Sequence, residues 1–80
     1  MINAKRTVTS QEVAVKFRLS YPTVTHYTNL GFFRVIGRRG NKRLYDEAQV
    51  RGSLRQLQRL ATEGYPLRLI RDKFIRLRPP

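Results

Sequence analysis

The chain contains no cysteine, a single histidine and only five acidic residues among its 80. Without cysteine it can form neither a disulfide nor a thiolate metal site. One histidine and five scattered acids cannot supply a metal cluster or a pair of nucleophile and base. We therefore expect no cofactor, no metal, no catalytic residue and no enzymatic activity.

Long apolar runs are missing as well. No apolar segment approaches the roughly 20 residues that a helix needs to span a bilayer. The N-terminus reaches Lys5 and Arg6 with no apolar core of a signal peptide behind them. These absences predict a soluble, cytoplasmic protein with no membrane partner.

Basic residues, by contrast, are abundant. Seventeen Lys and Arg against five Asp and Glu give a formal net charge of +12. An excess of this size repels other copies of the chain and attracts polyanions, so nucleic acid is the expected partner. A chain of 80 residues has room for one small domain, and we expect residues 1–80 to form a single unit.

A short helix is expected over residues 21–30, and the rest of the chain is organised around it. Ser20 suits its N-cap, Pro22 is tolerated in a first turn, and Gly31 is typical of the position just past a helix end. Apolar residues at every third position from Val24 to Leu30 can face a core. The polar face that remains consists of Thr23, Thr25, His26 and Asn29. Short donors and acceptors of this kind can read base edges.

A basic hairpin is expected directly after this helix. The arms run from Phe33 to Ile36 and from Lys42 to Tyr45, around a Gly-Asn pair that can form the turn. No acid interrupts the cations of this stretch, which are Arg34, Arg38, Arg39, Lys42 and Arg43. A polar helix beside a basic hairpin predicts a helix-turn-helix over residues 9–30 with a wing over residues 33–45.

Three further helices complete the expected fold. Thr9 and Glu12 match a capping box at the start of the first, and three residues, 18–20, lead from it to the helix of residues 21–30. Asp46 and Gln49 repeat the cap signature at the head of a helix over 46–63, and a last amphipathic helix covers 67–77. The predicted fold class is therefore mostly α, with about four helices and a two-stranded β-hairpin, and the wing arms are the only strand candidates.

Arginine recurs every four residues along the helix expected over residues 46–63, at Arg51, Arg55 and Arg59. Such a row is more often a solvated face than a binding surface. Its Arg59 end can nevertheless approach a phosphate backbone.

Four sequence blocks follow one another in a fixed order. They are Thr9-Ser-Gln-Glu-Val-Ala14, Tyr27-Thr-Asn-Leu-Gly31, Arg43-Leu-Tyr45-Asp-Glu47 and Glu63-Gly-Tyr-Pro-Leu67-Arg-Leu-Ile70. Together they resemble the opening helix, the helix end, the wing and the later helix joint of the DNA-binding domain of the MerR family of bacterial transcription regulators. The resemblance covers nearly the whole chain.

The resemblance implies a winged helix-turn-helix whose second helix enters the major groove of double-stranded DNA and whose wing grips the phosphates. The residues that it places on DNA are Tyr21, Thr23, Thr25, His26 and Tyr27 of the helix, Arg38, Arg39, Lys42, Arg43 and Tyr45 of the wing, and Tyr65 at a second wing. The implied function is sequence-specific DNA binding as a bacterial transcription regulator, at the nucleoid.

Two positions depart from the family pattern. Thr25 stands where the family usually has an arginine, and Lys42 where it usually has a tyrosine beside the wing arginine. These departures move the chain towards excisionase-like and other small winged helices that bend or coat DNA, which is the first alternative function. Sensor members continue into a long dimer helix and a ligand site, but we expect no effector or coiled-coil domain within residues 1–80. A truncated piece and a small complete regulator both remain open.

Two alternatives from other classes also remain. A basic RNA-binding domain would share the charge, although most aromatic residues here fall on predicted core stripes rather than on an exposed stacking surface. A module for an acidic protein would need an exposed apolar anchor, for which Phe32, Phe33 and Ile75 are the candidates. As for assembly, we expect a monomer in solution that binds DNA cooperatively with other copies through Phe74, Ile75 and Leu77.

Overall fold

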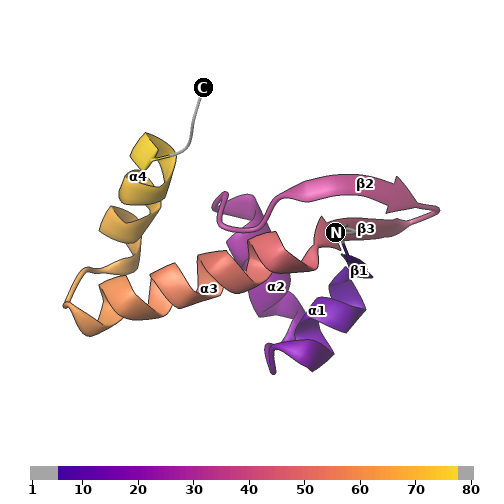
Figure 1. Cartoon of the computed structure of the whole chain (residues 1–80), viewed down its shortest axis with the longest axis horizontal. Coiled ribbons are helices and arrows are strands. Elements are labelled where there is room, and N and C mark those ends of the chain that lie inside the picture. The colour runs from indigo at the N-terminus through magenta and orange to yellow at the C-terminus, as the bar shows by residue number, and fades with distance from the viewer. Residues whose placement is uncertain (1–5, 78–80) are drawn as a thin grey trace, which may run out of the picture.

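A computed structural model of the chain describes the backbone of residues 6–77 and the side chains of residues 6–72. The elements follow in the order β1 (Thr7–Thr9), α1 (Ser10–Lys16), α2 (Tyr21–Asn29), β2 (Val35–Arg39), β3 (Lys42–Asp46), α3 (Glu47–Thr62) and α4 (Leu67–Leu77). The hairpin of β2 and β3 projects from one end of the molecule, and α4 lies at the opposite end of α3 (Figure 1). The predicted mostly helical fold with a hairpin wing is confirmed.

Local caps begin and end the helix-turn-helix where the sequence predicts. The Thr9 backbone N–H donates to Glu12 Oε1 over 2.8 Å, and the Glu12 N–H donates back to Thr9 Oγ1 over 3.2 Å, which completes the capping box. At α2, Ser20 Oγ accepts from the Thr23 N–H over 3.2 Å. Gly31 follows the helix with φ of 92°, a left-handed conformation that suits glycine after a C-cap.

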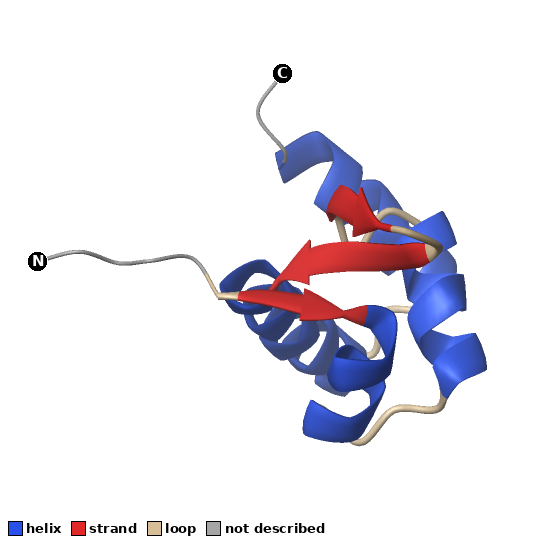
Figure 2. Cartoon of the chain, turned by 90° about the vertical axis from the view of Figure 1, so that its right-hand side faces the viewer, coloured by secondary structure: helices blue, strands red, loops and turns tan. Residues whose placement is uncertain are grey.

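The sheet has three strands over the described residues, in the order β1-β3-β2, and both pairings are antiparallel. Figure 2 shows the strands side by side with helices behind them. The expected Gly-Asn turn joins β2 to β3, and Gly40 has φ of 61°. The first arm was predicted over residues 33–36, but β2 begins at Val35 and runs on to Arg39, because Phe33 is buried in the core before the strand begins. The prediction that only the wing arms form strands was wrong, because β1 pairs Val8 with Tyr45. Three residues are too few to show an alternating pattern, so only the pairing reveals this strand.

The core lies between the sheet and the helices. Its buried apolar residues are Val8, Val13, Val24, Phe32, Phe33, Tyr45, Val50, Leu57, Leu60 and Ile70. Phe32 and Phe33 are 0% and 2% exposed, so neither can serve as the exposed anchor that a module for an acidic protein would need. Burial of these two rings removes the main sequence support for that alternative.

The start of α3 differs in one respect from the prediction. Asp46 caps the helix as expected and accepts from the Ala48 N–H over 3.3 Å. The Gln49 amide, however, turns to the preceding loop, where its oxygen accepts from the Arg34 N–H over 3.0 Å and its nitrogen donates to the Phe32 carbonyl over 3.1 Å. The second half of the predicted cap is therefore a clamp on the loop between α2 and β2.

The last helix ends the described part of the chain. Ile70 is buried against the core, whereas Leu67 and Leu69 are 39% and 42% exposed. The side chains of Phe74, Ile75 and Leu77, through which we expect copies to touch, lie outside the described residues. Across the described residues, no helix is both long and apolar enough to cross a membrane.

Candidate nucleic-acid interface

A groove of about 430 Å³ runs between α2, the start of α1 and the hairpin. Its lining residues are Thr9, Ser10, Gln11, Tyr21, Thr25, Arg38, Asn41, Lys42 and Arg43. Three of them are cations and none is an acid. The groove therefore joins part of the predicted helix surface to part of the predicted wing surface.

Of the five residues predicted on α2, Tyr21 and His26 are exposed, and Thr25 is half-buried but lines the groove. Tyr21 and Thr25 are four residues apart, so they share one face, and both line the groove. Tyr21 is 56% exposed, and His26 is exposed one position beyond Thr25. This surface offers neutral hydrogen-bonding groups beside the cations of the hairpin.

The other two α2 residues do not join the groove. Thr23 is half-buried, and its hydroxyl shares a 2.8 Å hydrogen bond with Ser20 Oγ at the helix cap. Tyr27 is half-buried against Phe32 and Phe33, with ring centroids 5.7 and 5.6 Å apart in edge-on contacts. The structure thus uses Thr23 to start the helix and Tyr27 to pack its inner side.

Four cations, which we call the wing cations, occupy the tip of the hairpin: Arg38, Arg39, Lys42 and Arg43. The strand register places Arg38 directly opposite Arg43, and Arg39 directly opposite Lys42. Like charges in directly opposed positions destabilise a sheet. Two such pairs in succession, with no acid at the four opposed positions, favour an anion that would relieve the repulsion.

Tyr45 does not lie on this surface, contrary to the sequence-based prediction. Its side chain is 0% exposed, and its hydroxyl lies 2.8 Å from Thr28 Oγ1 of α2. Because Thr28 donates its own proton to the Val24 carbonyl over 2.7 Å, Tyr45 is the donor in this bond. Arg43 and Tyr45 share a face of β3, since side chains alternate along a strand, but only the tip end of that face is open. Tyr45 therefore holds the hairpin against α2.

Tyr65 also lies away from the groove. It is partly buried in the connection between α3 and α4, where it packs against the core. Together with Tyr27 and Leu67 it lines a mainly apolar hollow that shares no residue with the groove. The structure does not bring this predicted second-wing residue together with the other site residues.

Four groove residues were missing from the sequence-based set: Thr9, Ser10, Gln11 and Asn41. Gln11 is exposed in the first turn of α1, and Asn41 is exposed in the hairpin turn. The signals that could have found these four are their places at a helix cap and in the Gly-Asn turn. Their hydroxyl and amide groups add neutral polar atoms to the groove.

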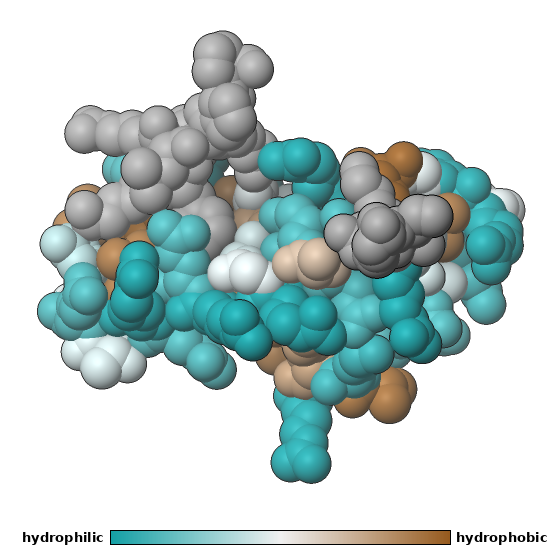
Figure 3. Space-filling view, viewed as in Figure 1, coloured by the Kyte–Doolittle hydropathy of each residue, from teal (hydrophilic) through white to brown (hydrophobic). Residues whose placement is uncertain are grey.

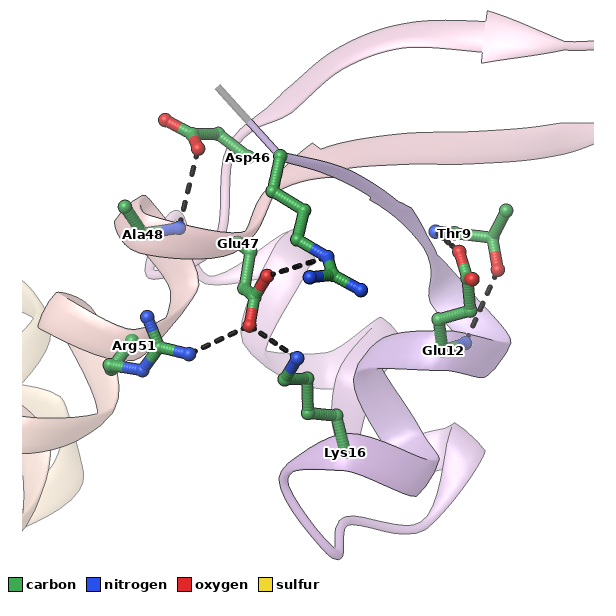
Figure 4. A network of polar contacts seen from close by, with 8 residues as sticks. Thr9, Glu12, Lys16, Asp46, Glu47, Ala48 and Arg51 are labelled. Atoms are coloured by element: carbon green, nitrogen blue, oxygen red, sulfur yellow. Dashed lines mark hydrogen bonds and ion pairs between the residues drawn. The ribbon is translucent and has the colours of Figure 1, made fainter. Parts of the chain in front are cut away.

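A second group of cations surrounds one buried carboxylate behind the hairpin, and we call it the Glu47 cluster: Glu47, Arg6, Lys16 and Arg51 (Figure 4). Glu47 Oε2 lies 2.6 Å from Lys16 Nζ and 2.7 Å from Arg51 Nη2, and Oε1 lies 3.3 Å from Arg6 Nε. Arg51 also stacks over the Phe17 ring at 5.8 Å. The cluster ties the residue before β1, the end of α1 and the start of α3 together, and so holds the helix-turn-helix against the sheet.

Two carboxyl groups have lowered pKa values that reflect these contacts. The hydrogen bond from Lys16, and after it the bond from Arg51, lowers the pKa of Glu47 although burial opposes the shift. At the start of α1, the backbone N–H of Thr9 lowers the pKa of Glu12. Within the described residues, no three His, Asp or Glu side chains lie close enough to hold a metal ion.

Comparison with known proteins bears on this geometry. A family model described as MerR HTH family regulatory protein matches residues 8–75, which span every element from the middle of β1 into α4. The comparisons with curated proteins and with solved structures found no match. Because the family match covers most of the chain and includes both α2 and the hairpin, the chain belongs to the MerR HTH family of regulatory proteins.

Proposed function

We propose that this chain binds double-stranded DNA in a sequence-specific manner, as a transcription regulator of MerR type. The observation that carries the proposal is the two pairs of opposed cations, Arg38 with Arg43 and Arg39 with Lys42, beside the polar side of α2. A hairpin with this register is stabilised by a polyanion, and an exposed helix beside it can enter a major groove. Membership of a family of DNA-binding regulators supports the same conclusion.

The wing cations and the polar side of α2 contribute differently to recognition. The wing cations neutralise phosphates, which supplies affinity for any sequence and orients the domain. Tyr21, Thr25 and His26 carry no permanent positive charge and present hydroxyl and imidazole groups to base edges, which supplies the preference for particular bases. Thr23, Tyr27 and Tyr45 support this surface from behind, through the helix cap and the core.

We further propose that residues 1–80 act as one unit in the bacterial cytoplasm, with other copies bound beside it on the same DNA. A single small domain buries roughly 600–1,000 Å² against DNA, which is usually too little for tight specific binding by one copy. Cooperation between neighbouring copies would supply the missing affinity.

Binding to three polyanions at several salt concentrations tests the proposal. The protein should bind duplex DNA more tightly than single-stranded RNA or an acidic protein, and selection from random duplexes should return a defined sequence. Thr25→Ala and His26→Ala should each change the preferred bases, because one good base contact contributes about 1–3 kcal/mol of discrimination. Thr62→Ala, on exposed α3 surface, is the matched control and should leave the preference unchanged. Equal affinity for RNA, or no preferred sequence, would contradict the proposal.

A further inference from the structure

A second basic hollow lies on the outer side of α3, away from the groove. It has a volume of about 330 Å³ and is lined by Gly52, Arg55, Gln56 and Arg59. It shares no residue with the groove between α2 and the hairpin. In the space-filling view, a hydrophilic band runs along the position of α3 on the side that faces the viewer (Figure 3).

The hollow points away from the helix-turn-helix. Val50, Leu57 and Leu60 are the buried apolar residues of α3. Since each residue of a helix is rotated by about 100° from the one before, Arg55 and Arg59 fall on the side opposite to these three. Both arginines are exposed. A ligand at this hollow would therefore approach the molecule from a different side than DNA in the groove.

Neither guanidinium of this hollow is neutralised by the described part of the chain. Arg55 and Arg59 make no ion pair or hydrogen bond with the side chains of residues 6–72. Arg51, one turn earlier, differs because it pairs with Glu47 at 2.7 Å. The nearest acid along the helix beyond Arg59 is Glu63, which caps the C-terminus and forms no ion pair with it. The hollow thus keeps two unneutralised positive charges, one helical turn apart.

Gly52 provides an independent reason to expect a ligand here. Glycine inside a helix lowers its stability relative to alanine. The backbone at Gly52 does not need glycine, because its φ is not positive, and a Cβ added there would meet no atom within 4 Å. No internal packing therefore explains the missing side chain. Because Gly52 has no side chain, the phosphate backbone of a ligand can approach the helix closely at this position, as it does at glycines of other phosphate sites.

We propose that the hollow on α3 binds the phosphate backbone of a second DNA duplex, so that one copy of the chain bridges two DNA segments. Guanidinium groups bind phosphate oxygens in bidentate geometry, and Arg55 and Arg59 lie about 6 Å apart along the helix axis, on the scale of neighbouring phosphates of one strand. The hollow shares no residue with the groove and lies on the outer side of α3, so we assign it to a second duplex rather than to the one in the groove. The bridging, though not the hollow itself, rests on the proposed DNA binding at the groove.

A capture experiment with the full 80-residue chain tests this site. The protein is first bound to an immobilised duplex, and capture of a second, fluorescent duplex is then measured over a range of salt concentrations. Binding of a single duplex in solution is measured separately by anisotropy. We expect the wild type to capture the second duplex. In the Arg55→Gln/Arg59→Gln variant, the log–log salt slope of capture should fall by about 1.8, or about 0.9 for each phosphate that the variant no longer neutralises.

Two further variants separate the hollow from bulk charge. Gly52→Ala should reduce capture several-fold while the protein melts at a higher temperature, because the added methyl group keeps a phosphate backbone from approaching the helix closely and favours the helix. Arg68→Gln/Arg71→Gln removes the same charge from exposed positions of α4 and should leave capture close to that of the wild type. Single-duplex affinity should stay within about twofold in Gly52→Ala, because the groove is unchanged.

The outcomes distinguish this inference from the proposed function. Loss of single-duplex binding in the wild type would remove the proposed function. Normal single-duplex binding without capture would overturn the second site alone. Capture that is reduced equally in the α4 variant would also overturn it, since bulk charge would then explain the loss. Capture that is unchanged in Arg55→Gln/Arg59→Gln would overturn it too, since two copies joined elsewhere would then form the bridge. Equal competition by a polyglutamate of matched charge would show a nonspecific polyanion surface and overturn it as well.

Discussion

The wing cations and the Glu47 cluster contain the same kinds of side chain in opposite electrostatic situations. Behind the hairpin, three cations surround the 4%-exposed Glu47 and are neutralised by it. At the hairpin tip, four cations oppose one another across two strands, and of these Arg39 also helps to lower the pKa of Glu12. The first group ties three segments of the domain together, and the second is the group that we propose to bind an external anion.

This contrast shows that positive charge by itself does not locate a binding surface. The chain carries 17 basic residues, and their count predicts a polyanionic partner but no particular face. The partners of each cation decide its role. Arg51 belongs to a row with Arg55 and Arg59 in sequence, yet only Arg51 reaches Glu47, so a single row contains both situations.

Removal of the charges of the wing cations should give the largest effect on binding. We expect Arg38→Ala, Arg39→Ala and Arg43→Ala combined to lower DNA affinity on every sequence and to reduce the log–log salt slope by about 2.7, at about 0.9 per neutralised phosphate. Stability should stay close to that of the wild type, because opposed like charges are removed. Anisotropy titrations over a salt series measure the slope. The charge-matched control is Arg18→Ala, Arg68→Ala and Arg71→Ala combined, and an equal reduction of slope there would contradict the assignment.

Removal of the neutralising acid should have its main effect on folding. In Glu47→Gln the three cations of the cluster face a neutral amide, so the melting temperature should fall further than in any single wing variant. Glu63→Gln, at the exposed end of α3, removes the same charge and should change stability by no more than about 0.5 kcal/mol. Thermal melts of both variants at pH 7 measure the difference. If the two variants melt alike, the cluster does not hold the fold.

The pH dependence of stability sharpens the same test. The folded protein holds the pKa of Glu47 below its ordinary value of 4.5. The stabilisation from this carboxylate is therefore fully present above pH 4.5, and it is lost as pH falls through the lower folded pKa. Glu47→Gln should show a weaker loss of stability below pH 4.5 than the wild type. Some loss should remain, because the pKa of Glu12 is lowered as well.

The smallest expected effect concerns Tyr45, which lies on the same strand as Lys42 and Arg43 but faces inward. Tyr45→Phe removes the hydrogen bond to Thr28 and should lower the free energy of unfolding by about 1 kcal/mol. The salt slope of DNA binding should not change, since the hydroxyl does not reach the surface. Denaturant unfolding and salt-dependent titration of one sample give both values. If Tyr45→Phe reduced the salt slope of DNA binding and left stability unchanged, Tyr45 would belong to the DNA interface after all.

Much of the fold could be predicted because its signals are local. The Thr9–Glu12 capping box, the Ser20 cap and the Gly40 turn each satisfy backbone groups within a few residues, so their sequence spacing is enough to locate them. The position of the wing cations on the hairpin could be predicted for a similar reason, since a basic run around a Gly-Asn turn places its charges near the tip, whereas their contact with DNA stays a prediction. It could not be predicted in the same way that some of the expected site residues face inward. Side chains alternate along a strand in the same manner at its base and at its tip, so the alternation does not tell which end is buried.

The sequence by itself determined the four helices to within a residue or two at their ends, the presence of the hairpin and its turn, the excess of positive charge and the resemblance to a family. Tertiary structure alone decided that β1 pairs with β3, that Gln49 clamps the preceding loop, and that Tyr45 is buried against Thr28. It also decided which cations Glu47 neutralises, because Arg6, Lys16 and Glu47 come from three separate segments. Contacts of this kind depend on how packed elements meet in space. The spacing of residues along the chain does not predict these contacts.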